Sequence, residues 1–375
     1  MQYLNIFHKA IQDPCSASLK MKSKEKKIIG YLCSYAPEEL IHAAGFHPIR
    51  LFSSGSEIIL AENHLQSYCC SLVRGILEES LSGKLDFLDG IVFPHTCDSI
   101  QRLSDIFRMN GKYEFFADVI MPAKLNSKTA KIYMKDVLLK FKSDLEKFSG
   151  NKITKSDIKD SISKFNIIRT SLNKIYNLRV QNPDILKSSD MHAVIKGAMI
   201  MDRDKLVELL PGLASNLSEK IRKMPDYSLN QYKHLLISGS ICDSPDIYDI
   251  IEKAGGRITG DDLCTGKRYF DQEIPENIDP IDALTERYFE RIICPAKHKS
   301  IIQRGENIVK LAKENKVDGV IFMFLKFCDP HAFDYPYLKS FLDKKKIKSI
   351  LIEIDDNTVN TEQLSTRFET FIHMI

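Results

Sequence analysis

The chain has 375 residues, of which 43% are hydrophobic and 27% are charged, as in an ordinary soluble protein of two or three domains. Lysine and arginine number 53 and aspartate and glutamate 50, so the net charge is only +3. This balance disfavours nucleic acid as the main partner. No apolar run approaches the roughly 20 residues of a membrane span, and no apolar leader is visible, so we expect a cytoplasmic protein that does not bind membranes.

The first third of the chain alternates short apolar runs with helical patterns. The runs, bounded by Gly, Pro, Asp or Asn, cover residues 28–33, 49–52, 89–94 and 115–120. Continuous apolar strands that are separated by helices predict a parallel sheet covered on both faces.

The middle of the chain has a different pattern. Long Lys-rich stretches with Leu and Ile at helical spacing predict amphipathic helices. After them the alternation of strands and helices resumes, in HLLISGS, RITG, KVDGVIFMF and KSILIEI. We therefore predict an α/β fold of two Rossmann-like parallel-sheet domains, 1–125 and 231–375, with a helical bridging region at 126–230.

One local pattern occurs in both predicted α/β domains. An Asp-Gly pair at 89–90 opens an apolar run, and a Cys-Asp pair at 97–98 follows it. The same order occurs with pairs at 318–319 and 328–329. This recurrence predicts two related domains that face each other.

Nine cysteines, an odd number, are not expected to form structural disulfides in a reducing compartment. Ligands bind at the carboxyl ends of parallel strands, and four cysteines follow predicted strands. These are Cys33, Cys97, Cys264 and Cys328. Cys70 and Cys294 are expected at helix starts, where backbone N–H groups and the helix dipole stabilise a thiolate.

A single buried cysteine is more often an inert core residue than a ligand. Six cysteines at strand ends and helix starts favour metal ligands instead, with Cys15, Cys69 and Cys242 as weaker candidates. No compact spacing such as C-x₂-C-x₂-C occurs, which disfavours a zinc ribbon or a local ferredoxin cluster. The sequence therefore predicts an iron–sulfur site that distant segments assemble.

Several segments together resemble the 2-hydroxyacyl-CoA dehydratase and benzoyl-CoA reductase family, from about Lys27 to the C-terminus. They include GYLCSYAPEELIHAAGFHPIRL, CCSLVRGILE, DGIVFPHTCDSIQRL, DDLCTGKRYF and DGVIFMFLKFCDPHAFDYPYLKSFL. The resemblance implies paired subunits, each with a [4Fe–4S] cluster on three cysteines, here Cys70, Cys97 and Cys328. It also implies a one-electron ketyl-radical reaction on an acyl-CoA thioester, driven by an ATP-dependent activator protein. No Walker A pattern occurs in the chain, so ATP hydrolysis is expected in that partner.

The chain also has cysteines at three further family positions, Cys33, Cys264 and Cys294. It is similar in this respect to double-cubane proteins, homodimeric reductases of small molecules in which six cysteines hold an [8Fe–9S] cluster. An acyl-CoA enzyme, a double-cubane reductase and a non-catalytic electron-storage or cluster-assembly protein therefore stay open. The partner is correspondingly either a sister subunit or a second copy.

Two other residues are candidates for catalysis. Glu39, in the segment APEEL, could transfer a proton in an acyl-CoA enzyme, although a carboxylate in the first turn of a helix also has a capping role. His95 precedes Cys97 closely and could donate a hydrogen bond to cluster sulfur or to substrate, or be an ordinary polar loop residue.

Overall fold

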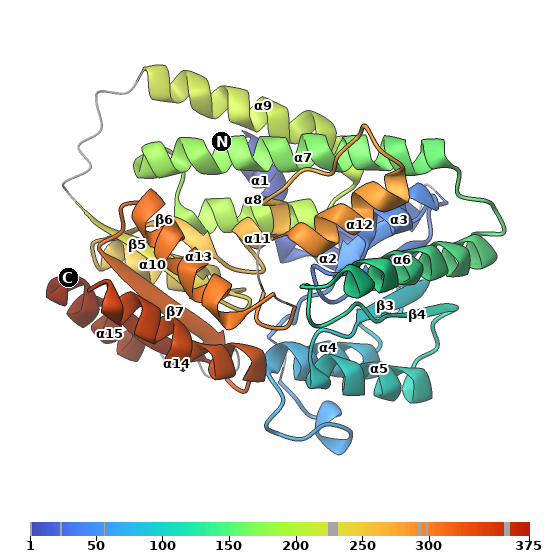
Figure 1. Cartoon of the computed structure of the whole chain (residues 1–375), viewed down its shortest axis with the longest axis horizontal. Coiled ribbons are helices and arrows are strands. Elements are labelled where there is room, and N and C mark those ends of the chain that lie inside the picture. The colour runs from blue at the N-terminus through green and yellow to red at the C-terminus, as the bar shows by residue number, and fades with distance from the viewer. Residues whose placement is uncertain are drawn as a thin grey trace.

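The computed structural model describes residues 2–22, 25–55, 57–223, 232–291, 294–297, 299–355 and 361–375. Figure 1 shows two α/β domains side by side, with long helices lying across both. Within the described ranges, no helix has the length and apolar character needed to cross a membrane. The predicted fold class, with two Rossmann-like parallel sheets, is confirmed.

The first domain contains a four-stranded parallel sheet in the order β2-β1-β3-β4. Its strands are β1 (Ile28–Tyr31), β2 (His47–Arg50), β3 (Gly90–Pro94) and β4 (Phe115–Val119). Its helical segments are α3 (Glu38–Ala43), η1 (Ala61–Asn63), α4 (Ser71–Leu81) and α5 (Asp98–Asn110). Every residue of β1 and β3 is buried, which explains why these central strands are apolar without alternation.

The second domain repeats this arrangement. Its parallel sheet has the order β6-β5-β7-β8, the same as in the first sheet when the strands are numbered within each domain. The strands are β5 (Lys233–Gly239), β6 (Gly256–Asp262), β7 (Gly319–Leu325) and β8 (Lys348–Ile354). The helices are α10 (Pro245–Lys253), α11 (Lys267–Phe270), α13 (Ile301–Glu314), α14 (Asp329–Lys344) and α15 (Thr361–Met374). Helix α12 (Pro280–Glu290) lies in the same stretch of chain but packs into the core of the first sheet. The shared topology agrees with the repeated sequence pattern.

Long helices connect the two domains, as predicted. They are α6 (Lys128–Ser149), α7 (Lys155–Gln181), α8 (Ser188–Ile200) and α9 (Arg203–Arg222), with η2 (Pro183–Ile185) between α7 and α8. Helix α7 contacts α3 of the first domain and β6 of the second, and α8 contacts β2 and α10. The N-terminal helices α1 (Gln2–Gln12) and α2 (Pro14–Lys22) pack against α8. The domain limits stay predictions: one falls between β4 and α6, and the other, at 230/231, lies outside the described residues.

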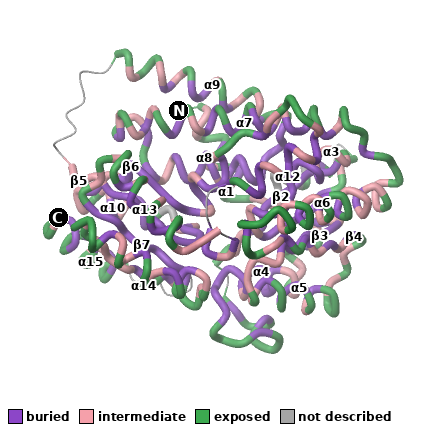
Figure 2. Tube along the Cα trace, in the orientation of Figure 1, coloured by how far each residue is buried: buried purple, intermediate pink, exposed green. Residues whose placement is uncertain are grey.

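One hydrophobic cluster joins the carboxyl ends of the two sheets. It contains Ile91 and Phe93 of β3 together with Ile241, which follows β5, and Leu325 of β7. Figure 2 shows buried residues along the strands and exposed residues on the outer helices. We call this cluster the interdomain core, because it packs the carboxyl end of one sheet against the carboxyl end of the other.

Candidate functional site

Six cysteines gather around the interdomain core. They are Cys33, Cys70, Cys97, Cys264, Cys294 and Cys328, and together they form what we call the six-cysteine site. Four of them follow strands β1, β3, β6 and β7. Because β1 and β3 are central neighbours in one sheet, and β5 and β7 in the other, the site lies at the topological switch points where such folds bind ligands.

The six thiols come from both domains and interact with one another. Five of the six belong to the interdomain core or pack against it, and Cys294 lies in a neighbouring cluster that Cys33 also contacts. Electrostatic interaction joins Cys328 to Cys70 and Cys97 across the domains. It also joins Cys294 to Cys33. The predicted convergence of distant cysteines is therefore present in the fold.

Three cysteines of the site are the N-cap residues of helices. Cys70 precedes α4, Cys97 precedes α5 and Cys328 precedes α14. Each thiol therefore lies beside the free N–H groups and the positive dipole end of a helix. The start of α4 was predicted, whereas the helix starts at Cys97 and Cys328 were not. Pro330, in the first turn of α14, was a usable signal, since proline favours that position.

The expected helix start at Cys294 is wrong. Cys294 lies between α12 and α13 and forms a short antiparallel bridge with Lys297. Its N–H donates to the carbonyl oxygen of Lys297 (3.3 Å), and the N–H of Lys297 donates back to that of Cys294 (3.2 Å). The backbone groups that would begin a helix are therefore used inside this turn, and α13 is capped by Ser300 instead.

Burial opposes ionisation of the thiols. It raises the pKa of Cys97 to about 12 and that of Cys294 to about 11. It also raises the pKa of Cys328 well above the usual range, although the N–H of His331 acts in the opposite direction. These three thiols therefore favour the protonated form at neutral pH, and a bound metal reverses this preference because it coordinates thiolate.

Buried cations surround the thiols. Arg268 and Arg291 are buried, and Nη2 of Arg291 donates to the carbonyl oxygen of Arg268 (2.6 Å). The ammonium of Lys297, only 3% exposed, donates to the carbonyl oxygens of His95 (3.0 Å) and Met121 (2.6 Å). No carboxylate among the described residues pairs with Lys297, and burial lowers its pKa while only cysteine thiols raise it. An unpaired buried ammonium implies an anionic group nearby.

This donor set fits an iron–sulfur cluster better than a single ion. In the part of the chain that the structure describes, no three His, Cys, Asp or Glu side chains meet closely enough to hold one metal ion. A cubane distributes its thiolates over separate iron atoms, so its ligands need not meet at one point. Buried and partly buried cysteines, helix N–H groups and adjacent cations are the kind of environment that an anionic cluster requires.

Glu39 lies in a buried ion-pair network. Its carboxylate, fully buried in α3, pairs with Arg169 of α7 and accepts a hydrogen bond from the hydroxyl of Tyr288 (3.2 Å). Burial acts to raise the pKa of Glu39, but Arg169 and Arg287 act more strongly together, so the pKa is lowered. The structure thus shows a partner for Glu39, and its role in proton transfer stays a prediction.

His95 lies at the edge of the six-cysteine site. Its Nε2 is 2.9 Å from Oδ1 of Asp118, and its backbone carbonyl accepts the hydrogen bond from Lys297. The ring is therefore oriented by Asp118, while the backbone is tied to a cation that interacts with Cys97. The predicted role of His95 as a donor stays a prediction.

Sequence reasoning missed Arg268, Lys297 and His331. All three occur in segments that carry the family resemblance or a cysteine, namely DDLCTGKRYF, IICPAKH and CDPHAF. Charged and polar residues in loops usually face solvent, and only the fold reveals that these three are buried. Their closeness to cysteines in sequence was the available signal.

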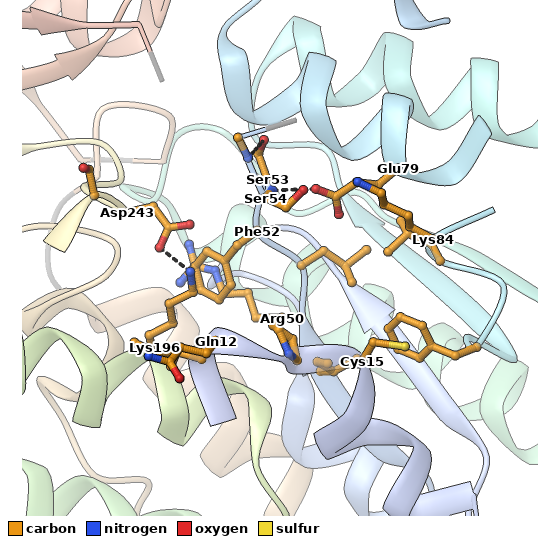
Figure 3. Close-up of a pocket in the computed structure, with 18 residues that line it drawn as sticks. Gln12, Cys15, Arg50, Phe52, Ser53, Ser54, Glu79, Lys84, Lys196 and Asp243 are labelled. Carbon is orange, nitrogen blue, oxygen red and sulfur yellow. Dashed lines mark hydrogen bonds and ion pairs between the residues drawn. The ribbon is translucent and has the colours of Figure 1, made fainter. Parts of the chain in front are cut away.

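A cavity of about 600 Å³ is lined by Arg50, which also contacts the backbone of Cys264. Figure 3 shows it between the loop after β2, the end of α4, helix α8 and the loop after β5. Arg50 forms part of the wall, and its Nη1 donates to the carbonyl oxygen of Cys264 (2.9 Å). Lys196 pairs with Asp243 (2.6 Å) and lies 4.8 Å from the ring centre of Phe52. One arginine therefore separates the cavity from a cysteine of the site.

The chain is similar over nearly its whole length to proteins of one family. The family model described as 2-hydroxyglutaryl-CoA dehydratase, D-component, matches residues 33–375. The beta subunit of (R)-phenyllactyl-CoA dehydratase from Clostridium sporogenes is 31% identical, over 99% of this chain and 98% of that protein. The beta subunit of (R)-2-hydroxyglutaryl-CoA dehydratase from Acidaminococcus fermentans is 29% identical, over 97% of each. A benzoyl-CoA reductase subunit from Thauera aromatica is 28% identical, over 95% of this chain and 92% of that protein. The chain therefore belongs to the 2-hydroxyacyl-CoA dehydratase and benzoyl-CoA reductase family, and is an enzyme of the dehydratase type.

Proposed function

We propose that this chain is the iron–sulfur subunit of a 2-hydroxyacyl-CoA dehydratase or benzoyl-CoA reductase type enzyme of the reducing cytoplasm. The observation that carries the proposal is the convergence of six thiols between two domains in a member of this family. The relatives are named as subunits, so we infer that this chain also works with a partner subunit. An ATP-dependent activator protein would be a further partner.

Cys70, Cys97 and Cys328 would hold a [4Fe–4S] cluster. When bound, such a cluster supplies single electrons at low potential. The protein contributes the surroundings: each of these three cysteines precedes a helix, and backbone N–H groups of the first helical turn stabilise the thiolates of Cys97 and Cys328. The interdomain core packs around them, and Lys297 places a positive charge beside Cys97.

The cavity beside Arg50 is the proposed site of the acyl-CoA thioester. Its volume is within the range of small-molecule sites, and it lies at the carboxyl ends of β2 and β5, where α/β folds bind ligands. Lys84 lines its rim and can attract the phosphates of coenzyme A, whereas the charge of Lys196 is paired with Asp243. Phe52 and Leu51 offer apolar surface to the rest of the ligand.

Replacing Lys84 with alanine is expected to weaken acyl-CoA binding about three- to fivefold, since an exposed charge contributes up to about 1 kcal/mol. Lys84 is exposed at the cavity rim, so its loss should leave folding unchanged. Calorimetric titration with a 2-hydroxyacyl-CoA thioester at low and moderate salt measures the effect. Lys223→Ala, at the exposed C-terminal end of α9, is the control, and equal affinities of the two variants would contradict this placement.

The principal test is anaerobic purification followed by iron and sulfide analysis. We expect a coloured protein that, with an activator and a partner subunit, dehydrates (R)-2-hydroxyacyl-CoA thioesters or reduces an aryl-CoA thioester. A colourless, iron-free anaerobic preparation would contradict the proposal. An iron-loaded protein that transfers electrons but acts on no thioester would instead support electron storage or cluster assembly.

A double-cubane reductase is the second candidate. It is favoured by the presence of Cys33, Cys264 and Cys294 in the same site as the other three cysteines. About eight iron atoms per six-cysteine site would indicate an [8Fe–9S] cluster, and about four would indicate a [4Fe–4S] cluster. Turnover of small molecules by a homodimer with an activator alone would support the same function.

A further inference from the structure

We infer that Arg268 and His331 are positioning residues that together orient the sulfurs of Cys264 and Cys328 and donate hydrogen bonds to them. The inference rests on the proposed function, because it concerns how this chain prepares its thiolates for a cluster. It extends that function because the guanidinium of Arg268 would link Cys328, one of the three proposed cluster ligands, to Cys264, one of the three further cysteines.

Arg268 is held rigidly by Asp262 at the end of β6. Nε of Arg268 donates to Oδ1 of Asp262 (2.6 Å), and Nη2 donates to Oδ2 (2.7 Å). Ser238 donates to the same carboxylate (3.0 Å), and Arg268 and Asp262 are 2% and 4% exposed. Two parallel bonds fix the plane of a guanidinium. The direction of the remaining nitrogen, Nη1, is therefore set by β6.

Nη1 of Arg268 points toward two groups of the six-cysteine site. It lies 3.7 Å from Sγ of Cys264 and 3.3 Å from Nε2 of His331, and it also donates to the carbonyl oxygen of Gly239 (3.0 Å). A guanidinium has donors only. Nη1 has two hydrogens for these three groups. In the inferred arrangement Nε2 of His331 accepts one of them, and the ring proton is on Nδ1.

The protonated Nδ1 of His331 faces the second sulfur. Nδ1 is 3.4 Å from Sγ of Cys328, so in this tautomer the hydrogen bond runs from nitrogen to sulfur. His331 is 6% exposed and packs against Phe324, which restricts its ring. With this tautomer, every hydrogen bond on the path from Asp262 through Arg268 and His331 to Cys328 has a defined direction.

N–H donors to coordinated sulfur make a cluster easier to reduce, because they offset the added negative charge. Removing the His331 donor is therefore expected to lower the potential of the cluster. Arg268 acts on both sulfurs at once, directly on Cys264 and through His331 on Cys328. Loss of Arg268 is therefore expected to lower the cluster potential more than loss of His331 does.

Redox titration monitored by electron paramagnetic resonance tests the pair in anaerobically purified full-length protein. At a fixed potential, His331→Phe should lower the ratio of reduced to oxidised cluster about tenfold, which corresponds to about 59 mV for one electron. His331→Asn, whose amide N–H can replace Nδ1–H, should restore most of the loss, and Arg268→Gln should exceed His331→Phe. Variants that lose iron but whose remaining clusters keep the original potential would overturn the inference.

A second measurement needs no cluster. Nitrogen-15 NMR of histidine-labelled, cluster-free protein should show Nδ1 of His331 protonated, and Arg268→Gln should abolish that preference. A protonated Nε2 in the unsubstituted protein would overturn the inference. An iron-free anaerobic preparation that nevertheless has the Nδ1–H tautomer would count against the proposed function and not against this geometry.

Discussion

Anaerobically purified Cys70→Ala protein is expected to contain almost no iron, whereas Cys69→Ala should contain as much as the unsubstituted chain. Cys70 is the N-cap of α4 and interacts with Cys97 and Cys328. The thiol of Cys69 instead lies 3.8 Å from the side-chain oxygen of Gln66. A cubane that loses one of its three protein ligands is not retained.

Cys69 is a closely matched control for Cys70. They are adjacent in sequence, both are buried, at 8% and 5% exposure, and both belong to the interdomain core. Truncation to alanine therefore costs a similar free energy of packing at each position, and only the ligand role differs. Iron and sulfide per chain, with the visible absorption of the cluster, measure the result. Equal iron in the two variants would contradict the assignment of Cys70 as a ligand.

The same assay applied to Cys264→Ala distinguishes the cluster types. If only Cys70, Cys97 and Cys328 bind, iron is retained, since Cys264 is then a neighbour and not a ligand. If the site holds a double cubane, iron falls to half or less. This variant therefore decides between the two candidate functions with one measurement.

Arg169→Met is expected to destabilise the folded protein by about 3–5 kcal/mol, the usual cost of leaving one member of a buried ion pair without its partner. Arg169 is 3% exposed and Glu39 is fully buried, and the pair joins α7 to α3. Urea unfolding of the cluster-free chain, followed by circular dichroism, measures the change. A loss below about 1 kcal/mol would show that the pair does not stabilise the fold.

The double variant Arg169→Met with Glu39→Gln is the control for this effect. Removing both charges avoids an unpaired buried carboxylate, so a large part of the stability should return. The pH dependence has a fixed sign: since the pKa of Glu39 is lowered in the folded state, its contribution is present at neutral pH and is lost as the pH falls through that lowered pKa. An unchanged acid-unfolding midpoint in Glu39→Gln would contradict this.

Much of the architecture could be predicted because local patterns determine it. The apolar runs around Ile28, Ile91 and Ile321 mark strands that are buried on both faces, and the repeated Cys-Asp pairs mark where two of them end. Long-range partners have no such local signal. Nothing near Glu39 in sequence points to Arg169, 130 positions away. Cys294 looked like a helix start because a proline follows it, but its backbone pairs with Lys297.

The six-cysteine site takes its thiols from positions as far apart as Cys33 and Cys328, and this has a consequence for biosynthesis. While the ribosome is still making the second domain, the first offers only an incomplete group of thiols. Iron delivered at that stage would find no closed, dry environment and would be exposed to exchange and oxidation. We therefore expect a cluster at this site to be assembled after release of the finished polypeptide, and truncated chains that lack the last third to accumulate without metal.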